Sequence, residues 1–162
     1  MESVLSKAIE IALAAHSGQT DRAGMPYIGH VMRVMQAGKT DDEKIVGVLH
    51  DVVEDTNWTF EQLAIEGFPT HIIDALRCIT KLSDIEPYDQ YIERVKPNSL
   101  ARSVKINDLS DNMDVRRMRE LTDMDIIRLK QYLNAYRKLT ENICLTYMSR
   151  VLMKIPSEDF WR

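Results

Sequence analysis

Helix-start signals recur along this chain, and they constrain its fold more than any other feature. Thr40 is followed three residues later by Glu43, and Thr59 by Gln62. At this spacing a hydroxyl before a helix and a carboxylate or amide in its first turn can exchange hydrogen bonds with the backbone. Apolar residues then recur every three or four positions, as one face of a helix requires. With no strand-like run of more than a few residues, we expect a single all-α domain of about seven to nine helices.

One segment interrupts this helical pattern. Gly24 and Pro26 lie within 19–27, which we expect to form a loop or a short hairpin between the first two helices. The Thr40 signal is expected to open one helix that continues through Val53, and Thr122 to open the longest helix. The whole chain, 1–162, is expected to be one domain with a core at about 4–148 and a loosely held tail at 149–162.

Composition excludes several classes of protein. Hydrophobic residues make up 44% of the chain and charged residues 28%, the balance of a globular protein. The net charge of −4 argues against a general nucleic-acid binder, because phosphate backbones demand a basic face. No apolar stretch approaches the roughly 20 residues that span a membrane. Cys78 and Cys144 are isolated, which suggests buried thiols in a reducing compartment. We therefore expect a cytoplasmic protein.

Four ionisable residues crowd one short segment, His50-Asp51-Val-Val-Glu54-Asp55. On a helix Glu54 lies four residues from His50, and Asp55 four from Asp51, so each pair shares a face. Three carboxylates this close repel one another unless protons or a cation compensate. A solvated acidic helix end would also have this composition. The flanking apolar residues leave little room for such a face, so a metal ion is the better explanation.

Two further segments make the signal specific. His30 follows the turn residues Pro26 and Tyr27, and Asp108 lies in a polar stretch within an apolar helical segment. This order of residues resembles the HD superfamily, in which a first His, an adjacent His-Asp pair and a distant Asp bind one divalent metal ion. The resemblance implies an HD-domain helical bundle with four metal ligands, His30, His50, Asp51 and Asp108.

The resemblance is closer to one family within that superfamily. Five segments, 15–19, 24–30, 50–56, 80–83 and 105–113, are similar to the hydrolase domain of RelA/SpoT alarmone enzymes, and above all to the stand-alone small alarmone hydrolases. The likeness covers about 4–145. No synthetase domain follows in this sequence, so only the hydrolytic half of that chemistry is expected.

The resemblance also implies a reaction and roles for further residues. The reaction is hydrolysis of the 3′-pyrophosphate of guanosine tetra- or pentaphosphate, with the ion usually manganese; residue types alone also suit Fe or Zn, and Mg stays open. Glu54 and Asp55 match the acidic pair that positions or activates the attacking water. Asn112 matches an asparagine near the substrate sugar, and Lys105 is a candidate phosphate contact.

The sequence departs from the family pattern where the base is recognised. Asp21 and Arg22 stand where relatives have Arg-Lys, and Asp111 stands where they often have His or Tyr. Because arginine stacks well on a flat ring, we expect Asp21→Arg to improve the use of ppGpp. Arg22, one position along, is the first candidate to hold the guanine if position 21 does not.

Three alternatives follow from these departures. The chain could be an HD phosphohydrolase for a different small phosphorylated or cyclic nucleotide, or a catalytically silent nucleotide-binding sensor. The intact pair Glu54 and Asp55 argues against the sensor, and the acidic balance against a nonspecific nucleic-acid phosphodiesterase. The expected partner is a small nucleotide, with no nucleic acid and no membrane. Tyr132, Tyr136 and Tyr147 on the last helix suit either the core or a subunit contact, which leaves a homo-oligomer open.

Overall fold

The computed structural model describes residues 3–81, 83 and 85–152, with side chains up to residue 141. The fold over these residues is helical, as predicted, and its only β-structure is one isolated bridge. The elements are α1 (Val4–Ala15), α2 (Ile28–Gln36), α3 (Asp41–Leu49), α4 (Val52–Asp55), α5 (Phe60–Ile65), α6 (Thr70–Ile79), α7 (Tyr88–Val95), α8 (Ser99–Asn112), the 3-10 helix η1 (Val115–Arg117) and α9 (Asp123–Leu152).

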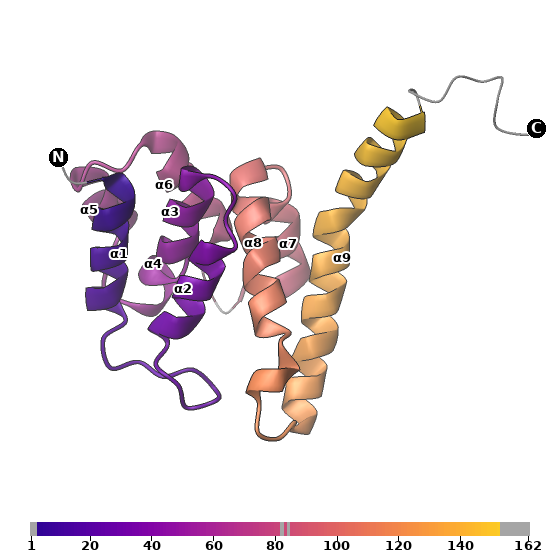
Figure 1. Cartoon of the computed structure of the whole chain (residues 1–162), viewed down its shortest axis with the longest axis horizontal. Coiled ribbons are helices and arrows are strands. Elements are labelled where there is room, and N and C mark those ends of the chain that lie inside the picture. Colours follow the sequence, from indigo (N-terminus) through magenta and orange to yellow (C-terminus); the bar gives the residue numbers. More distant parts are fainter. Residues whose placement is uncertain (1–2, 82, 84, 153–162) are drawn as a thin grey trace, which may run out of the picture.

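Helix α3 is the centre of the bundle and packs against α1, α2, α6 and α8 (Figure 1). Its residues Val46, Val48 and Leu49 are fully buried. Gly47 allows the close contact with α2, because a Cβ there would lie 3.1 Å from the Cα of Met35. This packing brings the end of α3 beside the start of α2 and one face of α8, where the candidate site lies.

The segment 19–27, which was predicted to be a loop or a short hairpin, forms a short hairpin. Thr20 and Pro26 make an antiparallel bridge, and the amide of Tyr27 donates to the carbonyl of Gln19 at 2.9 Å. Gly24 has a φ of 77°, a conformation that suits glycine best. The hairpin delivers the chain directly into α2 and so sets the position of His30.

The helix starts follow the predicted signals, but one expected helix is broken. Thr59 and Gln62 form the complete reciprocal cap. The helix expected from Thr40 through Val53 ends at Leu49 and resumes at Val52. The imidazole Nδ1 of His50 donates to the carbonyl of Gly47 at 2.8 Å. In an uninterrupted helix this carbonyl would accept a hydrogen bond from the amide of Asp51.

Helix α9 packs mainly against α8 and α7 and then continues past the other helices (Figure 1). Its last turn contains the first residues of the expected tail, and 153–162 lie outside the described residues. None of the described helices is long and apolar enough to cross a membrane. Cys78 is half-buried rather than fully buried as expected, and the side chains of Cys144 and Tyr147 lie outside the described part.

Candidate metal centre

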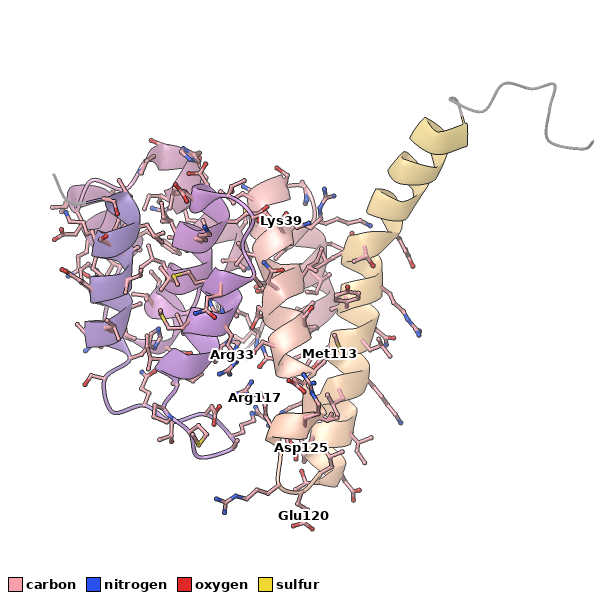
Figure 2. The ribbon with its side chains drawn as sticks, viewed as in Figure 1. Arg33, Lys39, Met113, Arg117, Glu120 and Asp125 are labelled. Atoms are coloured by element: carbon pink, nitrogen blue, oxygen red, sulfur yellow. The ribbon has the colours of Figure 1, made fainter. Side chains whose placement is uncertain are left out.

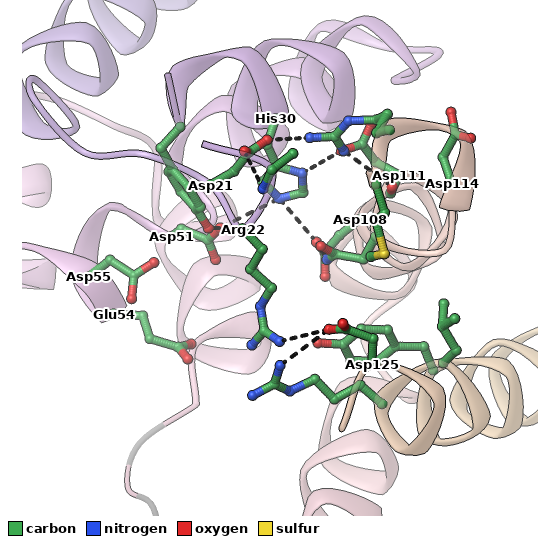
Figure 3. Close-up of a pocket in the computed structure, with 18 of the residues that line it drawn as sticks. Asp21, Arg22, His30, Asp51, Glu54, Asp55, Asp108, Asp111, Asp114 and Asp125 are labelled. Atoms are coloured by element: carbon green, nitrogen blue, oxygen red, sulfur yellow. Dashed lines mark hydrogen bonds and ion pairs between the residues drawn. The ribbon is translucent and has the colours of Figure 1, made fainter. Parts of the chain in front are cut away.

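Two histidines and two aspartates from three segments, His30, His50, Asp51 and Asp108, converge at one site. Figure 3 shows three of them, His30, Asp51 and Asp108. Ligand atoms of His30, His50 and Asp51 all lie within 4.8 Å of one another. Asp51 Oδ2 is 2.8 Å from His50 Nε2 and 3.7 Å from His30 Nε2. Asp108 Oδ1 is 3.3 Å and 3.6 Å from the same two nitrogens. The structure thus brings together the four residues that the sequence named as metal ligands.

The tautomers of the two histidines show why these residues fit a metal ion. His50 Nδ1 faces a backbone carbonyl and His30 Nδ1 faces a carboxylate of Asp111, so both Nδ1 atoms donate. In the neutral imidazole, the form that binds a metal ion, each Nε2 then presents a lone pair to the carboxylates of Asp51 and Asp108. His50 Nε2 is buried and makes no hydrogen bond among the described residues. Lone pairs facing lone pairs in a buried site are repulsive unless a cation lies between them.

The spacing of these atoms also fits a single ion. Ligand atoms at roughly 2.0–2.2 Å from one ion lie roughly 3.0–3.5 Å apart, close to the separations between the two histidine nitrogens and the two carboxylates. Imidazole with carboxylate suits Mn, Fe or Zn better than a site built only from oxygen atoms would. The donor set therefore accommodates a divalent transition metal ion.

Asp108 is held through both of its oxygens. Lys105 Nζ donates to Oδ2 at 2.7 Å, and Asn112 Nδ2 donates to Oδ1 at 2.6 Å. Burial, the largest effect, would raise the pKa of Asp108, but the charge of Lys105 together with the contacts of His30 and His50 lowers that pKa well below the usual value. Both residues were expected to contact substrate. They line the cavity, and the hydrogen bonds that they donate to Asp108 orient a candidate metal ligand.

Tyr27 has a role that the sequence analysis missed. Its hydroxyl donates to Asp51 Oδ2 at 2.5 Å. Burial, followed by the nearby charge of Asp51, raises the pKa of Tyr27 far above its usual value, so the hydroxyl keeps its proton and remains a donor. Tyr27 lies in the segment Pro26-Tyr27-Ile28-Gly29-His30, which was singled out for its histidine. Its partner Asp51 is 24 positions away, so the local pattern gave no sign of this contact.

Glu54 and Asp55 lie on the wall of the cavity next to Asp51 (Figure 3). Glu54 Oε2 accepts the backbone amide of Lys81 at 2.8 Å, which fixes the carboxylate against the wall. Both side chains stay open to solvent, and partial burial together with the charge of Asp51 raises the pKa of each. Raised values bring a carboxylate nearer to the range that suits a proton acceptor.

The cavity itself has a volume of about 450 Å³, a size typical of small-molecule sites. Arg22 from the hairpin and Arg128 from α9 share the carboxylate of Asp125 at 3.8 Å and 3.7 Å (Figure 3). Tyr132 adds an aromatic wall. Arg22 is thus at the cavity, as expected, while the contribution of α9 was not foreseen.

Asp21 lines the cavity, but its side chain holds the hairpin and Arg117. Its carboxylate accepts the amides of Ala23 and Met25, both at 2.9 Å, and pairs with Arg117 at 2.5 Å. A side chain with these contacts closes the hairpin and does not leave a vacant place for a base-stacking arginine. These contacts lead us to expect that Asp21→Arg would disturb the hairpin, in contrast to the predicted improvement in substrate use.

Comparisons with known proteins agree with this geometry. No model of a known protein family matches the chain. A chloroplastic protein of Arabidopsis thaliana named for GTP diphosphokinase activity is 37% identical over 105 residues, 59% of this chain and 12% of the relative. A protein of Aquifex aeolicus named guanosine-3′,5′-bis(diphosphate) 3′-pyrophosphohydrolase is 28% identical over 118 residues, 68% of this chain and 17% of the relative. The chain thus spans less than a fifth of these two relatives.

A solved structure is similar over nearly its whole length. It is of a protein described as a metazoan ortholog of SpoT that hydrolyzes ppGpp. The TM-score is 0.70 at 25% identity, covering 88% of this chain and 86% of that chain. With the helical fold and the clustered His and Asp residues, these likenesses define a domain of the HD superfamily. Within it, the chain is a RelA/SpoT-type HD domain.

Proposed function

We propose that this chain is a divalent-metal-dependent phosphohydrolase that converts guanosine 3′,5′-bis(diphosphate) and water to GDP and pyrophosphate. The observation that carries the proposal is the unpartnered, buried Nε2 of His50 facing His30, Asp51 and Asp108 at ligand spacing. These four residues would hold the ion, with manganese the ion we favour. A bound divalent ion would polarise a phosphoryl oxygen and make water more acidic.

Similar proteins support hydrolysis over synthesis. Relatives carry names for both activities, but they extend far beyond the part that matches. The metazoan structure matches over 86% of its own chain, and hydrolysis of ppGpp is the activity given for that protein. Hydrolysis is therefore the activity that belongs to the region shared with this chain.

The acidic pair on the cavity wall would carry out the proton transfer. A water oxygen attacks the phosphorus attached to the ribose 3′-oxygen, and Glu54 or Asp55 takes a proton from that water. The bond between phosphorus and the 3′-oxygen breaks, and the sugar oxygen receives a proton as pyrophosphate leaves. Glu54 is the better placed acceptor, because its second oxygen is already fixed by the Lys81 amide.

The cations around the cavity would bind the phosphates. Arg22 and Arg128 at its mouth share one carboxylate at almost 4 Å, so their guanidinium groups can turn toward an anion at little cost. Asn112 lies beside Asp108 at the cavity wall, where a ribose hydroxyl would be within its reach. The proposed partner is accordingly a small nucleotide.

The acidic lining favours a second substrate class as the runner-up. Eight carboxylates and five cations line the cavity, so its field is negative before a metal ion binds. A nucleotide with fewer phosphates, or a cyclic nucleotide, would be repelled less than ppGpp. Pyrophosphate and phosphate release measured over a nucleotide panel, with Mn, Mg, Zn and Fe each supplied, separates the two. Release of pyrophosphate from ppGpp above all other nucleotides supports the first; a faster reaction with another nucleotide supports the second.

A further inference from the structure

Asp111 links a metal-ligating histidine to two arginines. Its Oδ2 accepts His30 Nδ1 at 2.6 Å and Arg117 Nη1 at 2.7 Å. Arg33 adds two more bonds, from Nε to Oδ1 at 2.5 Å and from Nη2 to Oδ2 at 3.1 Å. The carboxylate therefore has one fixed orientation, and through it the imidazole of His30 has one tautomer and one ring plane.

Arg117 extends this set of contacts to the hairpin. Its Nη2 donates to Asp21 Oδ2, while its Nη1 holds Asp111. Asp21 in turn closes the hairpin through the amides of Ala23 and Met25. Figure 2 shows the side chains of Arg33 and Arg117 between α2 and η1. Two carboxylates and two guanidinium groups balance in charge; the two aspartates are about one-tenth exposed, while the arginines reach solvent.

We propose that Asp111 and Arg117 are positioning residues that set the affinity of the metal centre and tie it to the conformation of the hairpin 19–27. The inference rests on the proposed ligand role of His30. A carboxylate that accepts a hydrogen bond from the second ring nitrogen of a metal-ligating histidine usually contributes about 10- to 100-fold to metal affinity. Arg117 contacts Asp111 and Asp21 rather than a proposed ligand, so an effect of its substitution on metal binding would pass through Asp111 or through the hairpin.

The pairing also accounts for two departures from the family pattern together. Asp21 and Asp111 are 90 positions apart in the chain, yet Arg117 binds both. An acidic residue at only one of these positions would leave Arg117 with one partner. The two aspartates and the arginine therefore form one unit in this chain, and the hairpin that carries Arg22 to the cavity is held by the same unit that orients His30.

The test measures binding of Mn²⁺ alone to the purified full chain, by competition with a chromogenic chelator and by electron paramagnetic resonance of the bound ion. Asp111→Asn should weaken Mn²⁺ binding by about 10- to 100-fold. Arg117→Gln should give a smaller loss in the same direction. The matched controls are Asp114→Asn and Arg116→Gln, which alter a neighbouring ion pair that does not contact His30, and both should bind like the wild type.

Stability and coupling measurements keep the test decisive. The metal-free melting temperature of each variant is recorded, because a purely structural role would lower it without changing Mn²⁺ affinity, and that result would overturn the inference. If Asp21 acts on the metal centre through Arg117, the double variant Asp21→Asn/Arg117→Gln should lose no more Mn²⁺ affinity than the weaker-binding of the two single variants. Additive losses would overturn the link to the hairpin. A wild type that binds no divalent ion would instead refute the ligand assignment itself.

Discussion

Lys105 and Asp108 form a buried ion pair, with Nζ 2.7 Å from Oδ2 and only 4% of the Asp108 side chain exposed. Lys105 Nζ also lies 5.1 Å from the ring centre of Tyr91. The lysine thus supplies positive charge to the metal-free site.

Lys105→Met should destabilise the metal-free protein by about 3–5 kcal/mol, because it leaves Asp108 buried without its cation. Added Mn²⁺ should restore more stability to this variant than to the wild type, since the ion replaces the missing charge. Urea unfolding in EDTA and in Mn²⁺ measures both effects. Lys130→Met, on an exposed position of α9, is the control. Equal stability of Lys105→Met and wild type in EDTA would contradict the prediction.

His50→Ala, Asp51→Ala and Asp108→Ala should each lose bound metal and turnover together. Because an ion that binds only the folded state stabilises it by about 2.7 kcal/mol at 100 times its Kd, EDTA should lower the Tm of the wild type and leave these variants unchanged. Metal analysis and thermal melts provide the measurement. His71→Ala is the control, since His71 is exposed and pairs with Asp42. Full metal occupancy in the three variants would refute the ligand set.

Glu54→Gln should keep its metal and slow hydrolysis about 100-fold or more, the usual effect of losing a positioned base. Glutamine keeps the shape of the side chain and can still accept the Lys81 amide. Steady-state kinetics and metal content are compared with those of Glu61→Gln, a control on exposed α5. Near wild-type rates in both Glu54→Gln and Asp55→Asn would exclude the acidic pair from proton transfer.

The rate should depend on pH through the same pair. A base acts only when ionised, so kcat/KM should rise with pH as Glu54 and Asp55 lose their protons. Because burial and then Asp51 raise the pKa of both groups, this rise should occur above the usual carboxylate range and the rate should be lost as pH falls through it. A profile from pH 4 to 9 tests this. A rate that stays flat down to pH 4 would contradict it.

Asp21→Arg should weaken the protein rather than improve its catalysis. The substitution removes the acceptor for two hairpin amides and places a second guanidinium against Arg117. We expect a lower Tm and a higher KM for ppGpp. Asp21→Asn, which can still accept a backbone amide, should lie between this variant and the wild type. A lower KM for Asp21→Arg would restore the original expectation.

Local patterns predicted much of this molecule and missed the contacts that depend on distant residues. The caps at Thr40 and Thr59, the hairpin around Gly24 and the helical fold all follow from residues a few positions apart. The four proposed ligands were named because a known family order connects their distant segments, and the structure brings them together.

The misses share a physical cause. The hydrogen bonds of Tyr27 to Asp51 and of Arg117 to Asp21 can form only once α2, α3 and α8 have packed together. The break at His50 depends on an imidazole taking a backbone carbonyl, which periodicity alone does not reveal. The ion pair of Lys105 with Asp108 was not foreseen, because Lys105 was predicted to contact phosphate and Asp108 was assigned only to the metal ion.

The binding of the ion and the shape of the cavity depend on different helices in this fold. The ion cradle belongs to α2, α8 and the α3–α4 junction, whereas Arg128 and Tyr132 on the opposite wall belong to a helix whose main contacts are with α8 and α7. None of the four proposed ligands lies on α9, so substitutions at Arg128 or Tyr132 would change the wall of the cavity without removing a ligand of the ion. Substitutions along α9 could therefore change which molecules the cavity admits while the proposed metal ligands stay the same.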